Sequence, residues 1–197
     1  MVYNGIVSTL IETTKLWDEY TYQHQLGVAH LASSVASEMG LPEDTVETVK
    51  TAGFIHDIGK LSVPKDILSK FEELTPQEEN FVKIHPQTGY YFLESLGIPL
   101  AIAKIVYQHH ERMDGSGYPL GLKNGQISPE THILIVADVV EAMLSHRPYR
   151  PALGMDAVVK ELQQNKGILY DTRVVETCIN FLRKTQTIIE KQFIQWQ

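Results

Sequence analysis

The amino-acid sequence predicts an all-α fold, and three observations support that prediction. Apolar residues recur at the three- and four-residue spacing of a helix along nearly the whole chain. No pair of segments shows the apolar-polar alternation of neighbouring strands. The length of 197 residues, with 43% hydrophobic and 21% charged residues, suits one globular domain over residues 1–197. We therefore expect a single bundle of helices.

The first helices are separated by recognisable stop signals. Ile6, Leu10 and their apolar neighbours lie at helical spacing near the start of the chain. Gly40 and Pro42 end the second helix, because glycine favours the conformation that follows a helix and proline rarely continues one. The first three helices are expected over residues 5–17, 22–39 and 43–55.

A capping box predicts the start of the next helix. Thr75 is a good N-cap, Pro76 suits the first helical position, and Glu78 completes the box. This helix should end near His85, because Pro86 disfavours helical geometry in the residue before it. Two further helices are expected over residues 87–96 and 99–108.

The second half of the chain opens with a long loop. Residues 111–129 are rich in glycine and proline, and loops of this length are uncommon and often functional. Residues 130–145 follow as a helix that is apolar nearly all round, which predicts a central position. Helices are also expected over 154–164 and 171–184, with residues 188–197 extending the last one.

Composition restricts the class of protein. The net charge of −7 argues against non-specific nucleic-acid binding, so we expect no DNA or RNA duplex as partner. The single cysteine, Cys178, excludes an internal disulfide. No apolar run reaches the ~20 residues that span a bilayer, and the N-terminus lacks a signal-peptide pattern. A soluble cytoplasmic protein without a membrane segment is predicted.

Histidines and aspartates fall at helix ends and on the inward faces of the expected helices. His24 is in line with Val28, and Asp138 lies in the most apolar helix, where an unpaired carboxylate would be costly. The complete set is His24, His56, Asp57, His85, His109, His110 and Asp138. Any one of them alone favours a structural role, but together they indicate a metal site. Imidazole and carboxylate without thiolate suit iron, manganese or another divalent transition metal.

The motifs around these residues resemble those of the HD-GYP family, a branch of the HD phosphohydrolase superfamily. The matching segments are Asp18 to Thr21 with His24 and Val28-Ala29, Phe54 to Lys60, His85-Pro86 with Gly89, His109 to Arg112, Asp114 to Pro119, Ala137-Asp138, and Arg147 to Pro151. Their order and spacing are specific, and the match runs from about residue 18 to about residue 182. Residues 183–197 would then be a C-terminal helical extension. The resemblance implies an HD-type helical bundle around a metal centre.

The resemblance also implies a role for each motif residue. One metal would be held by His24, His56, Asp57 and Asp138. Asp57 would bridge to a second metal, held by His85, His109 and His110. Lys60 would face a substrate phosphate and would be catalytic together with Asp57. Substrate contacts are expected from Lys60, Gly117, Tyr118, Pro119, Glu141, Arg147 and Arg150.

The sequence departs from the family pattern at three places, one of which is Tyr170-Asp171-Thr172, where the family commonly has Phe-Asp-Pro. Some members have a glutamate four residues before the first histidine, where it supports a third metal, but this chain has Tyr20. The neighbouring Glu19 would point away from His24 on a helix. We therefore expect two metals. The family commonly has an aspartate where this chain has Glu141, a change that we expect to shift substrate contacts.

The implied activity is hydrolysis of a cyclic dinucleotide. By resemblance, the substrate would be cyclic di-GMP, cleaved to the linear dinucleotide and in some members to GMP. A hydroxide shared by two metals would attack phosphorus, while Lys60 stabilises charge on the phosphate oxygens. The alternatives are a phosphodiesterase for mixed cyclic GMP-AMP and a non-catalytic module that binds nucleotide or protein. A nucleotide phosphohydrolase is disfavoured by the Gly-Tyr-Pro loop. A homodimer or an attached sensor or receiver domain is compatible with the sequence.

Overall fold

The fold is seen in a computed structural model that describes residues 4–70, 72–146 and 151–194, with side chains described only as far as residue 185 within the last range. Most of these residues are helical, and none of them belongs to a β-strand. Two isolated bridges pair Asp114 with Lys123 and Lys166 with Tyr170. The predicted all-α fold is confirmed.

The helices follow the predicted order closely. They are α1 (Asn4–Trp17), α2 (Glu19–Glu38), α3 (Glu43–Ile55), the 3-10 helix η1 (Ile58–Ser62), α4 (Lys65–Leu68), α5 (Pro76–Lys83), α6 (His85–Ser95), α7 (Leu100–Gln108), α8 (Pro129–Leu144), α9 (Met155–Asn165) and α10 (Thr172–Ile194). Only η1 and α4 were not predicted, because four or five residues are too few to show a helical period. Within the described ranges, no helix has both the length and the apolarity needed to cross a bilayer.

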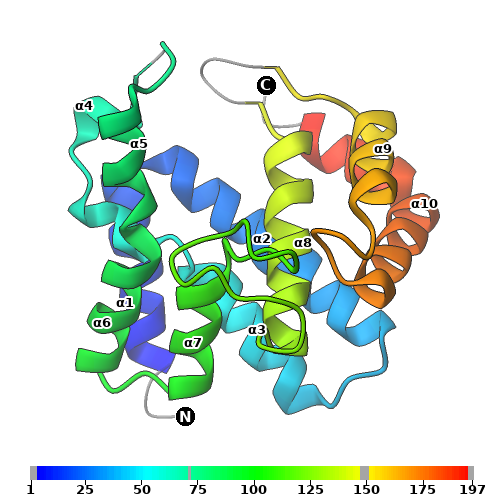
Figure 1. The fold of residues 1–197 in the computed structure, drawn as a ribbon, viewed down its shortest axis with the longest axis horizontal. Helices are drawn as coiled ribbons and strands as arrows, with labels where there is room; N and C mark the ends of the chain where they lie inside the picture. The colour runs from blue at the N-terminus through cyan, green and yellow to red at the C-terminus, as the bar shows by residue number, and fades with distance from the viewer. Residues whose placement is uncertain (1–3, 71, 147–150, 195–197) are drawn as a thin grey trace.

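Helix α8 lies in the middle of the molecule, with α6 and α7 on one side of it and α9 and α10 on the other (Figure 1). Its residues Ile133, Leu134, Ile135 and Val136 are all buried, as expected for a helix that is apolar nearly all round. Helix α2 packs against both α3 and α8. Helix α3 also packs against α8, so the segments that carry His24, His56 and Asp138 are direct neighbours.

The region around Pro86 differs from the prediction. Helix α5 ends at Lys83 and α6 begins at His85, so Pro86 lies in the first turn of a helix rather than after the end of one. Proline is tolerated there because the first N–H groups of a helix have no partner within the helix. As a consequence, His85 lies at the start of α6, which faces η1.

Candidate metal centre

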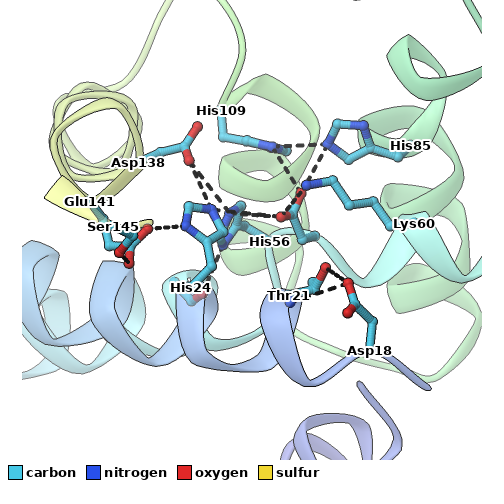
Figure 2. Close-up of polar contacts among 12 residues, drawn as sticks. Asp18, Thr21, His24, His56, Lys60, His85, His109, Asp138, Glu141 and Ser145 are labelled. Atoms are coloured by element: carbon cyan, nitrogen blue, oxygen red, sulfur yellow. Dashed lines mark hydrogen bonds and ion pairs between the residues drawn. The ribbon is translucent and has the colours of Figure 1, made fainter. Parts of the chain in front are cut away.

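The structure brings together all seven predicted metal ligands, which come from α2, α6 and α8 and from the residues that directly follow α3 and α7 (Figure 2 shows most of them). Three overlapping groups each have ligand atoms within 4.8 Å of one another. These groups are His24, His56 and Asp138; His56, Asp57 and His109; and His85, His109 and His110. Such an arrangement has ligand atoms for more than one ion.

Asp57 is at the centre of this cluster, and its two oxygens face different histidines. Oδ1 lies 3.2 Å from Nε2 of His85 and 4.0 Å from Nε2 of His109. Oδ2 lies 3.5 Å from Nε2 of His56 and 3.7 Å from Nε2 of His24. A carboxylate with one oxygen toward each pair of histidines has the geometry to be shared between two cations.

Close packing around Gly59 holds Asp57 in this position. A Cβ atom at Gly59 would lie 1.9 Å from the backbone oxygen of His85, so no larger residue fits without a shift of backbone. The absence of a side chain lets η1 lie directly against the start of α6. Asp57 and His85 are therefore brought together by backbone contact as well as by their own side chains.

Helix ends orient three of the histidines. Each of these imidazoles uses Nδ1 to donate to the backbone oxygen three residues earlier. The pairs are His56 with Gly53 at 2.8 Å, His85 with Val82 at 2.7 Å, and His109 with Val106 at 2.6 Å. The last carbonyls of a helix lack N–H partners within the helix, so they are free to accept these bonds. With the proton on Nδ1, the lone pair of Nε2 points into the cluster, which is the form that binds a metal.

Electrostatics favour neutral imidazoles and ionised carboxylates. Burial, assisted by His56 and His85, lowers the pKa of His109 to about 3. Burial likewise lowers the pKa of His56 below its ordinary value. Burial would raise the pKa of Asp57, but Lys60 and the nearby histidines outweigh it and hold that pKa well below its ordinary value. Metal ligands must be deprotonated, so these protonation states are ready for a divalent cation.

The pKa of His24 is shifted in the opposite direction. Burial alone would lower its pKa, but the carboxylates of Glu141 and Asp138 outweigh burial and raise it to about 10. Nε2 of His24 lies 3.1 Å from Oδ1 of Asp138. The negative surroundings that favour a proton on this ring equally favour a metal cation at Nε2. The donor atoms are thus buried nitrogens and oxygens, and the negative charge of the carboxylates suits a divalent metal cation.

Tyr20 and Glu19 lie where the helical geometry predicts. The ring of Tyr20 is parallel to that of His24, within 2°, with centroids 6.5 Å apart. Glu19 instead accepts a hydrogen bond from Nε2 of Gln23 on the exposed side of α2. Helix α2 begins at Glu19 because Asp18 caps it, so Glu19 belongs to the helix and does not face the cluster.

The cluster is open to solvent at one edge. Among the proposed ligands, side-chain exposure is 21% for His110, 11% for Asp138 and at most 4% for the rest. The neighbouring Lys60 is 24% exposed. Lys60 Nζ lies 2.6 Å from Oδ2 of Asp57 at this edge. The ring of Tyr118 lies over His110, with centroids 4.8 Å apart. Lys60, His110 and Asp138 thus form the accessible edge of the cluster, with Tyr118 beside His110.

The loop that carries Tyr118 is anchored by Glu111, for which the sequence had predicted no role. Glu111 is fully buried, and its carboxylate accepts the backbone N–H groups of Leu120 at 2.7 Å and Leu122 at 2.8 Å. Gly117 fits against the backbone of the same segment, where a Cβ would lie 2.4 Å from the Cα atom of Glu111. The available signal was a glutamate within a glycine-rich loop, because a buried carboxylate needs N–H donors.

The remaining predicted substrate contacts have different outcomes. Gly117, Tyr118 and Pro119 lie in the anchored loop beside His110. Arg147 and Arg150 lie outside the described residues. Glu141 is only 2% exposed, and its carboxylate contacts Nδ1 of His24 and accepts a hydrogen bond from Ser145. Glu141 therefore lies beside His24, one of the proposed metal ligands, and the sequence did not predict this contact.

Comparison with known proteins agrees with this geometry. A family model described as HD domain matches residues 6–174. The cyclic di-GMP phosphodiesterase response regulator RpfG of Xanthomonas campestris is 41% identical over 155 residues, which cover 77% of this chain and 41% of that protein. A cyclic di-GMP phosphodiesterase of Thermotoga maritima is 34% identical over 196 residues, which cover 96% of this chain and 53% of that protein.

Two further similarities concern substrate and fold. The 3'3'-cGAMP-specific phosphodiesterase 1 of Vibrio cholerae is 35% identical over 141 residues, which cover 72% of this chain and 33% of that protein. The solved HD domain of the L. monocytogenes phosphodiesterase PgpH has a TM-score of 0.66 at 20% identity, covering 90% of this chain and 98% of that one. That similarity shows the fold alone. The chain spans about half or less of the length of these curated relatives.

Proposed function

The chain belongs to the HD domain family and to its HD-GYP branch, and from this premise we propose that it is a metal-dependent phosphodiesterase for a cyclic dinucleotide. The observation that carries the proposal is the placement of Asp57. Its two oxygens face separate histidines, and Lys60 lies beside it at the open edge of the cluster. Metal ligands, a cation for phosphate and an accessible edge thus occur together.

The ligand assignment follows the two sides of Asp57. His24, His56 and Asp138 would hold one metal with Asp57, and His85, His109 and His110 would hold the second. When bound, two divalent ions supply an activated water nucleophile and Lewis-acid stabilisation of the phosphate oxygens. Iron or manganese suits this nitrogen and oxygen donor set.

Lys60 and the loop around Tyr118 would bind the substrate. The ammonium group of Lys60 is 24% exposed, and a lysine serves phosphate as a compact point charge. Its present partner is Asp57, so a metal on Asp57 would compete with Lys60 and turn it toward an incoming phosphate. Tyr118 and its neighbours Gly117 and Pro119 would form one wall of the substrate site. Bidentate contacts from Arg147 and Arg150 remain a prediction of the sequence.

Cyclic di-GMP is the substrate that we propose, because two relatives at 41% and 34% identity carry that activity in their names. Mixed cyclic GMP-AMP is the second candidate, supported by the relative at 35% identity. A non-catalytic binding module would be expected to lack ligands, whereas the cluster contains all seven. A cytoplasmic location also remains a prediction of the sequence.

One experiment tests the proposed function directly. The protein is stripped of metal, reloaded anaerobically with iron or manganese, and incubated with cyclic di-GMP, cyclic GMP-AMP and cyclic di-AMP in parallel. The products are separated by chromatography. We expect linear dinucleotide from cyclic di-GMP, with no turnover in the metal-free sample. Hydrolysis of none of the three by the reloaded protein would exclude the proposal, and preference for the mixed dinucleotide would favour the second candidate.

The number of metals is tested separately. We propose two rather than three, because Tyr20 takes the place of a carboxylate ligand and a phenol with a pKa near 10 is a poor ligand at neutral pH. Glu19 faces solvent and bonds Gln23. Anomalous scattering from crystals grown with excess manganese should show two peaks. A third well-occupied peak beside His24, with Tyr20 or Glu19 as ligand, would contradict the proposal.

A further inference from the structure

His24 differs from the other buried histidines in how its ring is held. His56, His85 and His109 each bond a carbonyl at the end of a helix through Nδ1. His24 lies within α2, which runs from Glu19 to Glu38, and carbonyls inside a helix already accept N–H groups one turn later. In place of a carbonyl at a helix end, Nδ1 of His24 has a side chain from another helix as its partner.

The side chain that takes this role comes from α8, 117 residues further along the chain. The carboxylate of Glu141 contacts Nδ1 of His24, on the opposite side of the ring from Nε2, which faces Asp138 and Asp57 (Figure 2). Oε1 of Glu141 also accepts the hydroxyl hydrogen of Ser145, the residue that directly follows α8. Both oxygens of this buried carboxylate thus have partners.

Gly27 makes the contact between His24 and Glu141 sterically possible. It lies one turn after His24 on α2, and a Cβ there would be 2.8 Å from Cγ and 3.1 Å from Oε1 of Glu141. Real Cβ atoms do not approach a neighbour this closely, so a side chain at this position would displace Glu141. Glycine is unfavourable inside a helix, and here the close approach of Glu141 explains its presence.

We propose that Glu141 is the positioning residue for His24: it fixes the ring with Nε2 toward Asp57 and Asp138, and thereby raises the metal affinity of this half of the centre. A carboxylate that accepts Nδ1–H selects the tautomer that binds metal and increases the basicity of the coordinating nitrogen. Loss of such a partner typically lowers metal affinity about 10–100-fold. The inference rests on the metal centre of the proposed function, but not on the identity of the substrate.

Titration of the metal-stripped protein with Mn²⁺, followed by the electron paramagnetic resonance of the free ion, measures the affinity directly. Glu141→Gln keeps the shape of the side chain but removes its charge, so the dissociation constant should rise about 10-fold or more. Glu141→Asp should recover part of the affinity, because it restores a carboxylate. Glu161→Gln is the matched control: Glu161 is a half-buried carboxylate whose hydrogen bonds join it to Tyr170 and Asn165 rather than to a proposed ligand. The Glu161→Gln protein should bind Mn²⁺ with the affinity of the wild type.

Gly27→Ala tests the same contact without changing the carboxylate. Because alanine favours a helix over glycine, any loss of Mn²⁺ affinity must come from displacement of Glu141 rather than from lower helix propensity. The affinity should fall to a similar extent as in Glu141→Gln. In a Glu141→Ala background the same substitution should change affinity less than about twofold, since no side chain is left to displace.

The outcomes separate this inference from the proposed function. If the wild type binds two Mn²⁺ ions and Glu141→Gln binds them equally tightly, the positioning role is wrong and the metal centre stands. If the wild type binds fewer than one equivalent, the metal centre fails and the inference fails with it. Hydrolysis adds a further readout: activity of Glu141→Gln should recover as Mn²⁺ is raised.

Discussion

Gly59 packs against the first residue of α6 so closely that its replacement by alanine should disturb both packing and metal binding. The added Cβ would lie 1.9 Å from the backbone oxygen of His85 and 2.7 Å from the backbone nitrogen of Gly89. Contacts below 3.0 Å essentially do not occur, so η1 and α6 must separate by roughly 1 Å. Neither neighbour is the end of a flexible side chain, so the backbone itself has to move.

The displacement has a stability cost and a functional one. Overpacking of this kind costs about 1–3 kcal/mol, which corresponds to a fall in Tm of roughly 2–12 °C for a chain of this length. The same movement separates Oδ1 of Asp57 from Nε2 of His85, which are 3.2 Å apart. A shift of about 1 Å at a reacting centre can reduce turnover about 100-fold. We therefore expect Gly59→Ala to bind less than two equivalents of Mn²⁺ and to hydrolyse substrate far more slowly.

Gly89→Ala is the matched control for this prediction, because Gly89 lies on the other side of the same contact. A Cβ there would meet Gly59 at 3.3 Å and Val106 at 3.4 Å, which are tight but attainable distances. Its Tm should change by less than about 4 °C, since the gain in helix propensity offsets the closer contact. Thermal unfolding and Mn²⁺ titration of both variants provide the comparison. A Gly59→Ala protein with wild-type Tm and two tightly bound ions would refute the reasoning.

Three further predictions concern charge. Asp57→Ala should lose both its metals, measured by elemental analysis, and its hydrolytic activity. Lys60→Ala should keep its metals but hydrolyse substrate more slowly. An Asp57→Ala protein that keeps metals and activity, or a Lys60→Ala protein with full activity, would exclude the respective assignment. Glu111→Gln should lose a charged hydrogen bond worth roughly 1.5–3 kcal/mol and should therefore loosen the loop that carries Tyr118. Limited proteolysis should cut this loop faster, and steady-state kinetics should give a higher KM. An unchanged KM would contradict the anchoring role of Glu111. Lys70 and Thr75 lower the pKa of Glu78 from 4.5 to about 2. The contribution of Glu78 to folding stability is therefore fully present above pH 4.5 and is lost as pH falls toward 2. The difference in Tm between wild type and Glu78→Gln should therefore narrow over that range, and a constant difference would show that Glu78 does not contribute through its charge.

Much of the fold was predictable because its signals are local. The capping box of Thr75 and Glu78 is present, and α8 is buried as its apolar composition predicted. The position of Pro86 was misjudged, since the same residue can follow one helix or begin the next. The distinction depends on where His85 is held in space.

The sequence by itself determined which residues form the cluster, because helix periodicity and motif spacing record which faces turn inward. Tertiary structure alone decided how those residues are oriented. Glu141 orients His24 across 117 residues, and Gly59 brings Asp57 against His85 through backbone atoms. A hydrogen bond between distant segments depends on how α2 and α8 pack, and no local pattern of amino acids encodes that distance. Thus Glu141, which the sequence predicted to contact substrate, lies buried with its carboxylate against His24.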